Sequence, residues 1–211
     1  VSEDWLQRQL FEAPACLQIE TIERGIIAPL RSVCREFPTA HGPIDNVFMT
    51  SQGDIVIAEV KLWRNPEARR KVVAQALDYA SCIFQMSYSE FEQAALAGIL
   101  GDRPKPRSLY EFVSGQKSHA EEPLEEPEFI DQVCRNLKRG NIVVLVVGDG
   151  IRESTEQLAE TLQAHAMLRF TFALVEMSIY TLAGRKGRLL LPRTLARTQM
   201  IERGVISIVE G

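Results

Sequence analysis

The chain has 211 residues, of which 45% are hydrophobic and 25% are charged, and its formal net charge is -4. This composition excludes a disordered chain, a collagen-like chain and a disulfide mini-protein, and the length is enough for one domain with a sizeable core. A pI near 5.5 would normally argue against a nucleic-acid binder. Residues 121–131 alone carry -6, however, and without them the remaining chain carries +2.

The cysteines predict a reducing environment, because they are far apart and form no Cys-x-x-Cys pair: Cys16, Cys34, Cys82 and Cys134. The apolar runs are far shorter than the roughly 20 residues of a membrane helix. Residues 1–10 include Glu3, Asp4 and Arg8 in place of the apolar core of a signal peptide. We therefore expect a soluble, cytoplasmic protein with no membrane partner.

The N-terminal third predicts two helices and then three strands. The helices are expected over 3–12 and 15–27, and the second has an apolar stripe that includes Ile19, Ile22 and Ile26. Glu23 falls inside this stripe, where a carboxylate usually needs a partner or a metal. The strands are expected over 30–38, 44–50 and 54–63, with a hairpin turn at 51–54.

The middle of the chain predicts helices over 66–86 and 89–99, followed by an insertion over 101–128. The insertion is rich in Pro and Glu, so we expect an exposed, partly mobile segment and not a packed element. A helix over 128–139 and a buried strand over 141–147 follow. The remaining segments are a helix over 155–167 and strands over 170–182, 187–191 and 204–209.

Chemistry is concentrated at the second and third strands. Because strand side chains alternate, Glu59 and Lys61 point to one face, while Val60 points to the other. Asp45 lies on the preceding strand across the turn and can sit beside them. Two converging carboxylates suit Mg²⁺, the Val60 carbonyl can add a ligand, and Lys61 can orient or deprotonate a water.

This arrangement resembles the Asp…Glu-x-Lys motif of the PD-(D/E)XK nuclease superfamily, the restriction-endonuclease-like phosphodiesterases. The resemblance covers residues 15–86, with a last core strand at 141–147, and departs from the motif in having Ile44 between Pro43 and Asp45. It implies an α/β fold with an αβββαβ core and a mixed central sheet flanked by helices. The first-helix acid of the family would be Glu23, with Glu20 as the alternative.

The resemblance also sets the expected domain organisation. Residues 1–211 would form a single nuclease-like domain, whose core comprises about 15–86 and 141–167. The insertion at 101–128 and a β-rich C-terminal extension at 168–211 would be added to this core.

The helix over 66–86 carries a second resemblance. Gln75 and Tyr79 are four residues apart and share one face. They match the Gln-x-x-x-Tyr motif of RecB-type nucleases, which implies that Gln75 assists the metal-site water and that Tyr79 helps to hold the nucleic-acid strand. Tyr79 could also stack on a base or sugar. The alternative is that Gln75 caps polar backbone and that Tyr79 is semi-buried packing.

A basic cluster follows the strand motif. Residues 61–71 contain five basic residues and one acid, and the predicted nucleic-acid ligands there are Arg64, Arg69, Arg70 and Lys71. Some of these could instead pair with acids. A second basic stretch, 185–203, could extend the nucleic-acid track or be solvated surface.

We therefore expect a nuclease that hydrolyses phosphodiester bonds of DNA with a water activated by Mg²⁺ or Mn²⁺ and by Lys61. The protein could form a homodimer, because cutting two strands would favour one. The candidate catalytic residues are Asp45, Glu59, Lys61 and Gln75, and the candidate metal ligands are Asp45, Glu59, Val60 and Glu23. A catalytically inactive module that binds nucleic acid or protein is the alternative. A nucleotide-binding turn at 148–150 is a third option, although these residues fit a plain turn better.

Overall fold

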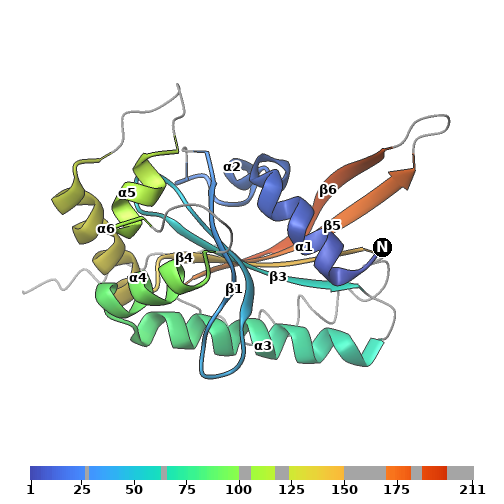
Figure 1. Ribbon diagram of the computed structural model, residues 1–211. Coiled ribbons are helices and arrows are strands. Elements are labelled where there is room, and N and C mark those ends of the chain that lie inside the picture. Colours follow the sequence, from blue (N-terminus) through green and yellow to red (C-terminus); the bar gives the residue numbers. More distant parts are fainter. Residues whose placement is uncertain are drawn as a thin grey trace, which may run out of the picture.

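The computed structural model describes residues 1–26, 29–62, 66–99, 106–116, 124–149, 170–181 and 187–198. Within these residues the fold is α/β, with one six-stranded mixed sheet in the order β1-β2-β3-β4-β5-β6 (Figure 1). The strands are β1 (Arg31–Phe37), β2 (Ile44–Met49), β3 (Ile55–Leu62), β4 (Ile142–Asp149), β5 (Thr171–Thr181) and β6 (Arg188–Arg197).

The sheet combines two kinds of strand pairing. Strands β1, β2 and β3 form an antiparallel meander, and the β2–β3 turn contains Gly53 at a φ of +82°. The neighbours β3, β4 and β5 are parallel, and β6 returns antiparallel to β5. The two C-terminal strands therefore belong to the same sheet as the N-terminal meander.

Helices cover both faces of this sheet (Figure 1). One face carries α1 (Glu3–Glu12), the 3-10 helix η1 (Pro14–Leu17) and α2 (Ile19–Ile22). The other carries α3 (Pro66–Gln85), α4 (Tyr88–Ala97), α5 (Leu109–Ser114) and α6 (Glu126–Arg139). Among the described helices, none is long and apolar enough to cross a membrane.

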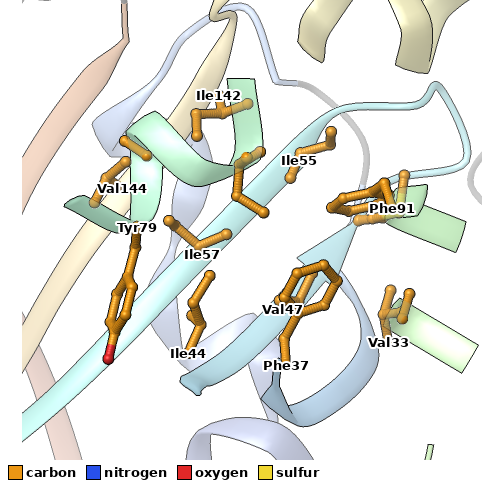
Figure 2. Packing of buried hydrophobic residues seen from close by; sticks show 14 of the residues in the cluster. Val33, Phe37, Ile44, Val47, Ile55, Ile57, Tyr79, Phe91, Ile142 and Val144 are labelled. Carbon is orange, nitrogen blue, oxygen red and sulfur yellow. The ribbon is translucent and has the colours of Figure 1, made fainter. Parts of the chain in front are cut away.

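Alternation along the strands divides the core into two layers. On β3, Ile55 and Ile57 pack under α3, whereas Val56, Ala58 and Val60 pack under α1. Figure 2 shows the first layer, in which Ile57 lies among side chains from neighbouring strands and from α3. Because Glu59 and Lys61 continue the alternation of Ile55 and Ile57, they belong to the α3 face.

The helix predicted over 15–27 is wrong. Pro14 starts a 3-10 turn, Gln18 has a left-handed φ of +48°, and α2 ends after only four residues at Ile22. Glu23 then adopts an extended conformation at the C-cap. The apolar stripe that suggested a helix is nevertheless buried, because a turn followed by a short helix presents the same residues to the sheet.

The expectation of no packed element in 101–128 is also wrong in part. Ser108 caps α5 by accepting a hydrogen bond from the Glu111 N–H, and Leu109 and Val113 are fully buried. These two apolar residues lie four apart and so share one helix face. The predicted helix at 155–167 and the predicted strand at 204–209 lie outside the described residues.

Candidate active site

The Asp45 side chain bridges β2 and β3 where their backbone pairing ends. The paired positions begin at Asn46 and Ala58. Beyond them, Oδ2 of Asp45 accepts a hydrogen bond of 2.6 Å from the Val60 N–H. Asp45 is half-buried, and this bond to a strand N–H fixes its carboxylate against β3.

Glu59 places a second carboxylate on the α3 face of β3. The residue is only 3% exposed, its Oε1 lies 3.2 Å from Nζ of Lys61, and its Oε2 is buried without a hydrogen-bond partner among the described residues. A buried carboxylate oxygen without a partner is costly. This oxygen is therefore suited to accept a proton or a cation.

Sequence reasoning missed Glu3, which α1 brings to the same place. Its Oε1 accepts a hydrogen bond of 3.0 Å from the Leu62 N–H, and its Oε2 lies 3.6 Å from Nζ of Lys61. Lys61 is thus held between the carboxylates of Glu59 and Glu3. The helical spacing of α1 could have identified Glu3 from the sequence, because it puts Glu3 one turn from Gln7 and close to the buried residues Leu6 and Leu10.

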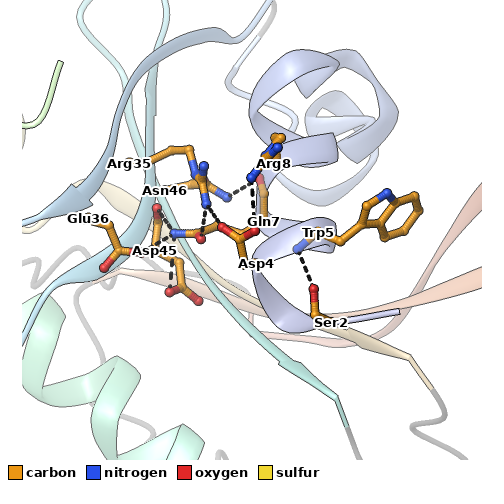
Figure 3. Close-up of polar contacts among 9 residues, drawn as sticks. All are labelled: Ser2, Asp4, Trp5, Gln7, Arg8, Arg35, Glu36, Asp45 and Asn46. Atoms are coloured by element: carbon orange, nitrogen blue, oxygen red, sulfur yellow. Dashed lines mark hydrogen bonds and ion pairs between the residues drawn. The ribbon is translucent and has the colours of Figure 1, made fainter. Parts of the chain in front are cut away.

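Gln7 was missed as well, and it connects α1 to Asp45 (Figure 3). It is 4% exposed, and its Nε2 donates to the Asp45 carbonyl at 2.7 Å and to Oε1 of Glu36 at 2.7 Å. Its Oε1 accepts a hydrogen bond from Arg35. Glu36 has a left-handed φ of +54° and lies opposite Asp45, between two paired positions of β1 and β2. Gln7 therefore bridges two acids that face each other.

The pKa values of the two central carboxyl groups are raised. Burial raises the pKa of Asp45 to about 6, against the lowering effect of the Val60 N–H. Burial and the charge of Asp45 raise the pKa of Glu59 to about 7. For Lys61, burial lowers the pKa, but the carboxylates of Glu59 and Glu3 outweigh it and raise it overall.

Gln75 and Tyr79 lie on α3, beside the same end of β2. The Tyr79 hydroxyl donates to the Pro43 carbonyl at 2.9 Å and accepts a hydrogen bond from Nε2 of Gln75. Gly42 lies beside this hydroxyl at a φ of +109°, a backbone conformation that residues with a Cβ rarely adopt. The charges of Glu59 and Asp45 contribute to raising the Tyr79 pKa, after burial.

The stacking role expected for Tyr79 is incompatible with this placement. The residue is 1% exposed, and Figure 2 shows its ring against the apolar layer. A base needs an open aromatic face, which this ring does not offer. The structure instead assigns Tyr79 to packing and to holding the half-buried Gln75 beside the Gly42–Pro43 turn.

Glu23 is not brought to Asp45 and Glu59. Its Oε2 accepts a hydrogen bond of 2.6 Å from the Thr171 hydroxyl at the start of β5. Thr171 on β5 pairs with Val143 on β4, which in turn pairs with Val56 on β3. Thr171 is therefore two strands away from β3, at the position of a residue that precedes Glu59 by three. Glu20, the alternative, is exposed on α2.

The predicted basic ligands are only partly placed. Arg64 lies outside the described residues, and Arg69, Arg70 and Lys71 belong to the first turns of α3, where only the backbone is described. Gly148 is not part of a turn, because it pairs within the sheet with Lys61 and Glu176. Asp149 is the last residue of β4, so the turn predicted at 148–150 does not begin at Gly148, and Gly150 lies outside the described residues.

Few side chains of the described residues could act as ligands for a metal ion at this site. No group of three or more His, Cys, Asp or Glu suited to a metal occurs in the described part of the chain. Asp45 and Glu59 supply a pair of hard oxygen donors, and one Glu59 oxygen lacks a partner there. This pair fits Mg²⁺ or Mn²⁺, whose remaining ligands are commonly water and substrate phosphate.

Comparison with known proteins adds no assignment to this geometry: no family model, curated protein or solved structure matches the chain.

Proposed function

We propose that the protein is a metal-dependent nuclease that hydrolyses phosphodiester bonds, with DNA as its substrate. The observation that carries the proposal is the Asp45–Glu59 pair beside Lys61, with a buried Glu59 oxygen that has no hydrogen-bond partner among the described residues. Such a cluster of opposed charges in a half-buried setting is typical of functional sites.

The order of elements supports the same proposal. In chain order, α1 precedes strands β1–β3, α3 follows them, and β4 comes later, which gives α, βββ, α, β with η1 and α2 inserted before β1 and α4, α5 and α6 inserted before β4. This is the order expected from the resemblance to the PD-(D/E)XK superfamily, with α1 in place of the helix expected at 15–27. Helix α1 also contributes an acid, Glu3, next to Lys61.

Each residue has a defined task in this proposal. Asp45 and Glu59 hold Mg²⁺ or Mn²⁺, with the Val60 carbonyl as a third donor. When bound, the cation would lower the pKa of water and offset charge on the phosphoryl oxygens. Lys61 orients the attacking water and adds a positive charge beside the phosphate. Gln75, held by Tyr79, donates a hydrogen bond toward the same water.

The direct test is cleavage of single-stranded, duplex and branched DNA and RNA with Mg²⁺, with Mn²⁺ and with EDTA. Asp45→Ala and Lys61→Ala are expected to lower the cleavage rate at least about a hundredfold, while circular dichroism shows an intact fold. Glu23→Gln is the matched control, because Glu23 contacts Thr171 and not Asp45. Unchanged metal-dependent cleavage in either site variant would overturn the proposal.

A metal titration decides between this proposal and a catalytically inactive binding module. Calorimetry with Mn²⁺ is expected to give binding in the wild type and none in Asp45→Ala. A wild-type protein that binds nucleic acid but neither binds Mn²⁺ nor cleaves would instead be an inactive module.

A further inference from the structure

Strands β5 and β6 extend past the rest of the sheet as a two-stranded arm. Pairing between β4 and β5 ends at Gly148 and Glu176, whereas pairing between β5 and β6 continues to Thr181 and Arg188. Figure 1 shows this ribbon leaving the sheet. We call residues 177–181 and 188–192 the arm.

One face of the arm is apolar and exposed. Four large hydrophobic residues of the described chain are exposed, and three of them lie on the arm: Tyr180 at 53%, Leu189 at 44% and Leu191 at 46%. Tyr180 is paired with Leu189, and Leu191 lies two residues further along β6, so all three share one face. We call these three residues the arm face. Apolar side chains grouped in this way in water indicate a binding surface.

The arm face lies on the same side of the sheet as the candidate active site. One row of paired positions runs from Lys61 through Gly148 and Glu176 to Arg193. Paired residues share a face, and Arg193 is two residues from Leu191. Gly148 places no side chain between Lys61 and Glu176. With about 4.8 Å between strands, Arg193 lies on the order of 14 Å from Lys61 across the sheet.

Arg193 provides a positively charged group at the base of the arm. Its Nη2 lies 2.7 Å from Oε2 of the buried Glu176, yet its side chain is 68% exposed. A guanidinium has five N–H donors, so the anchored group can still donate to a phosphate. Of the basic residues on β6, Arg193 is the one on the side of the arm face, because Arg188 and Arg197 point to the opposite side. The exposed guanidinium of Arg193 therefore suits a phosphate that lies next to the arm face.

We propose that the arm face binds an unpaired segment of the nucleic-acid substrate, which continues from the active site across Gly148. Arg193 contacts a phosphate, Tyr180 stacks on a base, and Leu189 and Leu191 pack against bases or sugars. An unpaired strand exposes the apolar faces of its bases, whereas a duplex buries them by stacking. This inference rests on the proposed nuclease function and adds the single-stranded character of the substrate.

The test is fluorescence anisotropy in EDTA, where metal-dependent cleavage does not interfere. The probes are a labelled mixed-sequence DNA strand and the same strand annealed to its complement. Tyr180→Ser is expected to weaken single-strand binding about tenfold. Arg193→Gln keeps a donor toward Glu176 but removes the charge, and is expected to reduce the slope of log affinity against log salt by about 0.7.

Two exposed residues off the arm face supply matched controls. Arg188 is adjacent to Leu189 on β6 and therefore points to the opposite face, where it lies over the Trp5 ring. Arg188→Gln is expected to leave the affinity and its salt slope unchanged. Val1→Ser, which removes an exposed apolar residue outside the arm, is expected to do the same.

The outcomes separate this inference from the proposed function. If the wild type binds the single strand and Tyr180→Ser and Arg193→Gln bind it equally well, the arm is not a binding surface, and the nuclease proposal stands. If these variants weaken binding but no metal-dependent cleavage occurs, the arm inference stands and the nuclease proposal fails. Tighter binding of the duplex, or a mass change in Tyr180→Ser by light scattering without loss of DNA affinity, would overturn the inference.

Discussion

Lys61 and Glu59 form an ion pair in which only one oxygen of the carboxylate is used. Nζ of Lys61 lies 3.2 Å from Oε1 of Glu59, while Oε2 has no hydrogen-bond partner in the described part of the protein. Glu59 is 3% exposed, so water compensates little for this missing bond. The pair therefore combines the attraction between Lys61 and Glu59 with the uncompensated desolvation of the second Glu59 oxygen. Both contributions to the free energy of unfolding can be measured.

Removing Lys61 is expected to destabilise the protein by leaving Glu59 buried without its cation. At pH 8, Lys61→Met should lower the free energy of unfolding by about 1–3 kcal/mol. The double variant Lys61→Met/Glu59→Gln should recover most of this loss, because no buried charge remains. Urea unfolding of the four proteins gives the coupling energy. Strictly additive single and double variants would contradict a direct interaction between the two side chains.

The raised carboxyl pKa values predict that the metal-free protein loses stability as the pH rises. The pKa is about 6 for Asp45 and about 7 for Glu59, against ordinary values of 3.8 and 4.5. Between these values the folded protein holds protons that the unfolded chain has released. Their contribution is fully present below about pH 4 and is lost as the pH rises through 6 and 7.

The variant Glu59→Gln removes the Glu59 contribution to this pH dependence and leaves the Asp45 contribution. At pH 8 in EDTA, Glu59→Gln is expected to be roughly 2 kcal/mol more stable than the wild type, because an amide carries no buried charge. At pH 4 the two proteins should be about equally stable. Urea unfolding at a series of pH values measures both curves. If the free energy of unfolding of the wild type instead rises relative to that of Glu59→Gln between pH 5 and pH 8, the predicted direction of the pH dependence is wrong.

Gln7 is expected to act on the metal site through Asp45. Gln7→Leu removes the donor to the Asp45 carbonyl and to Glu36, which should lower Mn²⁺ affinity about tenfold or more. Calorimetry measures this directly. Gln9→Leu is the matched control on the same helix, because Gln9 bonds to Glu12. If both variants bind Mn²⁺ like the wild type, Gln7 has a purely structural role.

Tyr79→Phe tests whether the Tyr79 hydroxyl positions Gln75. Losing the bonds to Pro43 and Gln75 should cost about 1–2 kcal/mol of stability and should also slow cleavage. Tyr88→Phe is the control, because it removes a half-buried tyrosine hydroxyl that bonds to Glu92 on α4. Equal cleavage rates in the two variants would show that Tyr79 acts only in packing.

The parts of the site that sequence predicted are those determined by local geometry. Alternation on β3 placed Glu59 and Lys61 on one face, and the hairpin turn placed Asp45 beside them. Both relationships depend on residues within one hairpin, so a strand pattern is enough to specify them.

The parts that sequence did not predict depend on distant packing. Gln7 meets Asp45 across 38 positions, and Glu3 meets Leu62 across 59. The pattern at 15–27 correctly identified buried residues but could not show which N-terminal segment would cover the β2–β3 junction. For Tyr79, helical spacing could not distinguish an exposed ring edge from a buried ring.

The hydrogen bond from Val60 to Asp45 makes one amide a natural reporter of the site. The Val60 N–H is bonded to a side chain that titrates and is proposed to bind a cation, in contrast to the N–H groups of the regular ladder. Any change that draws the carboxylate away from β3 would weaken protection of this single amide against exchange with solvent deuterium. The occupancy of the site can therefore be followed at one backbone nitrogen, with no substrate present.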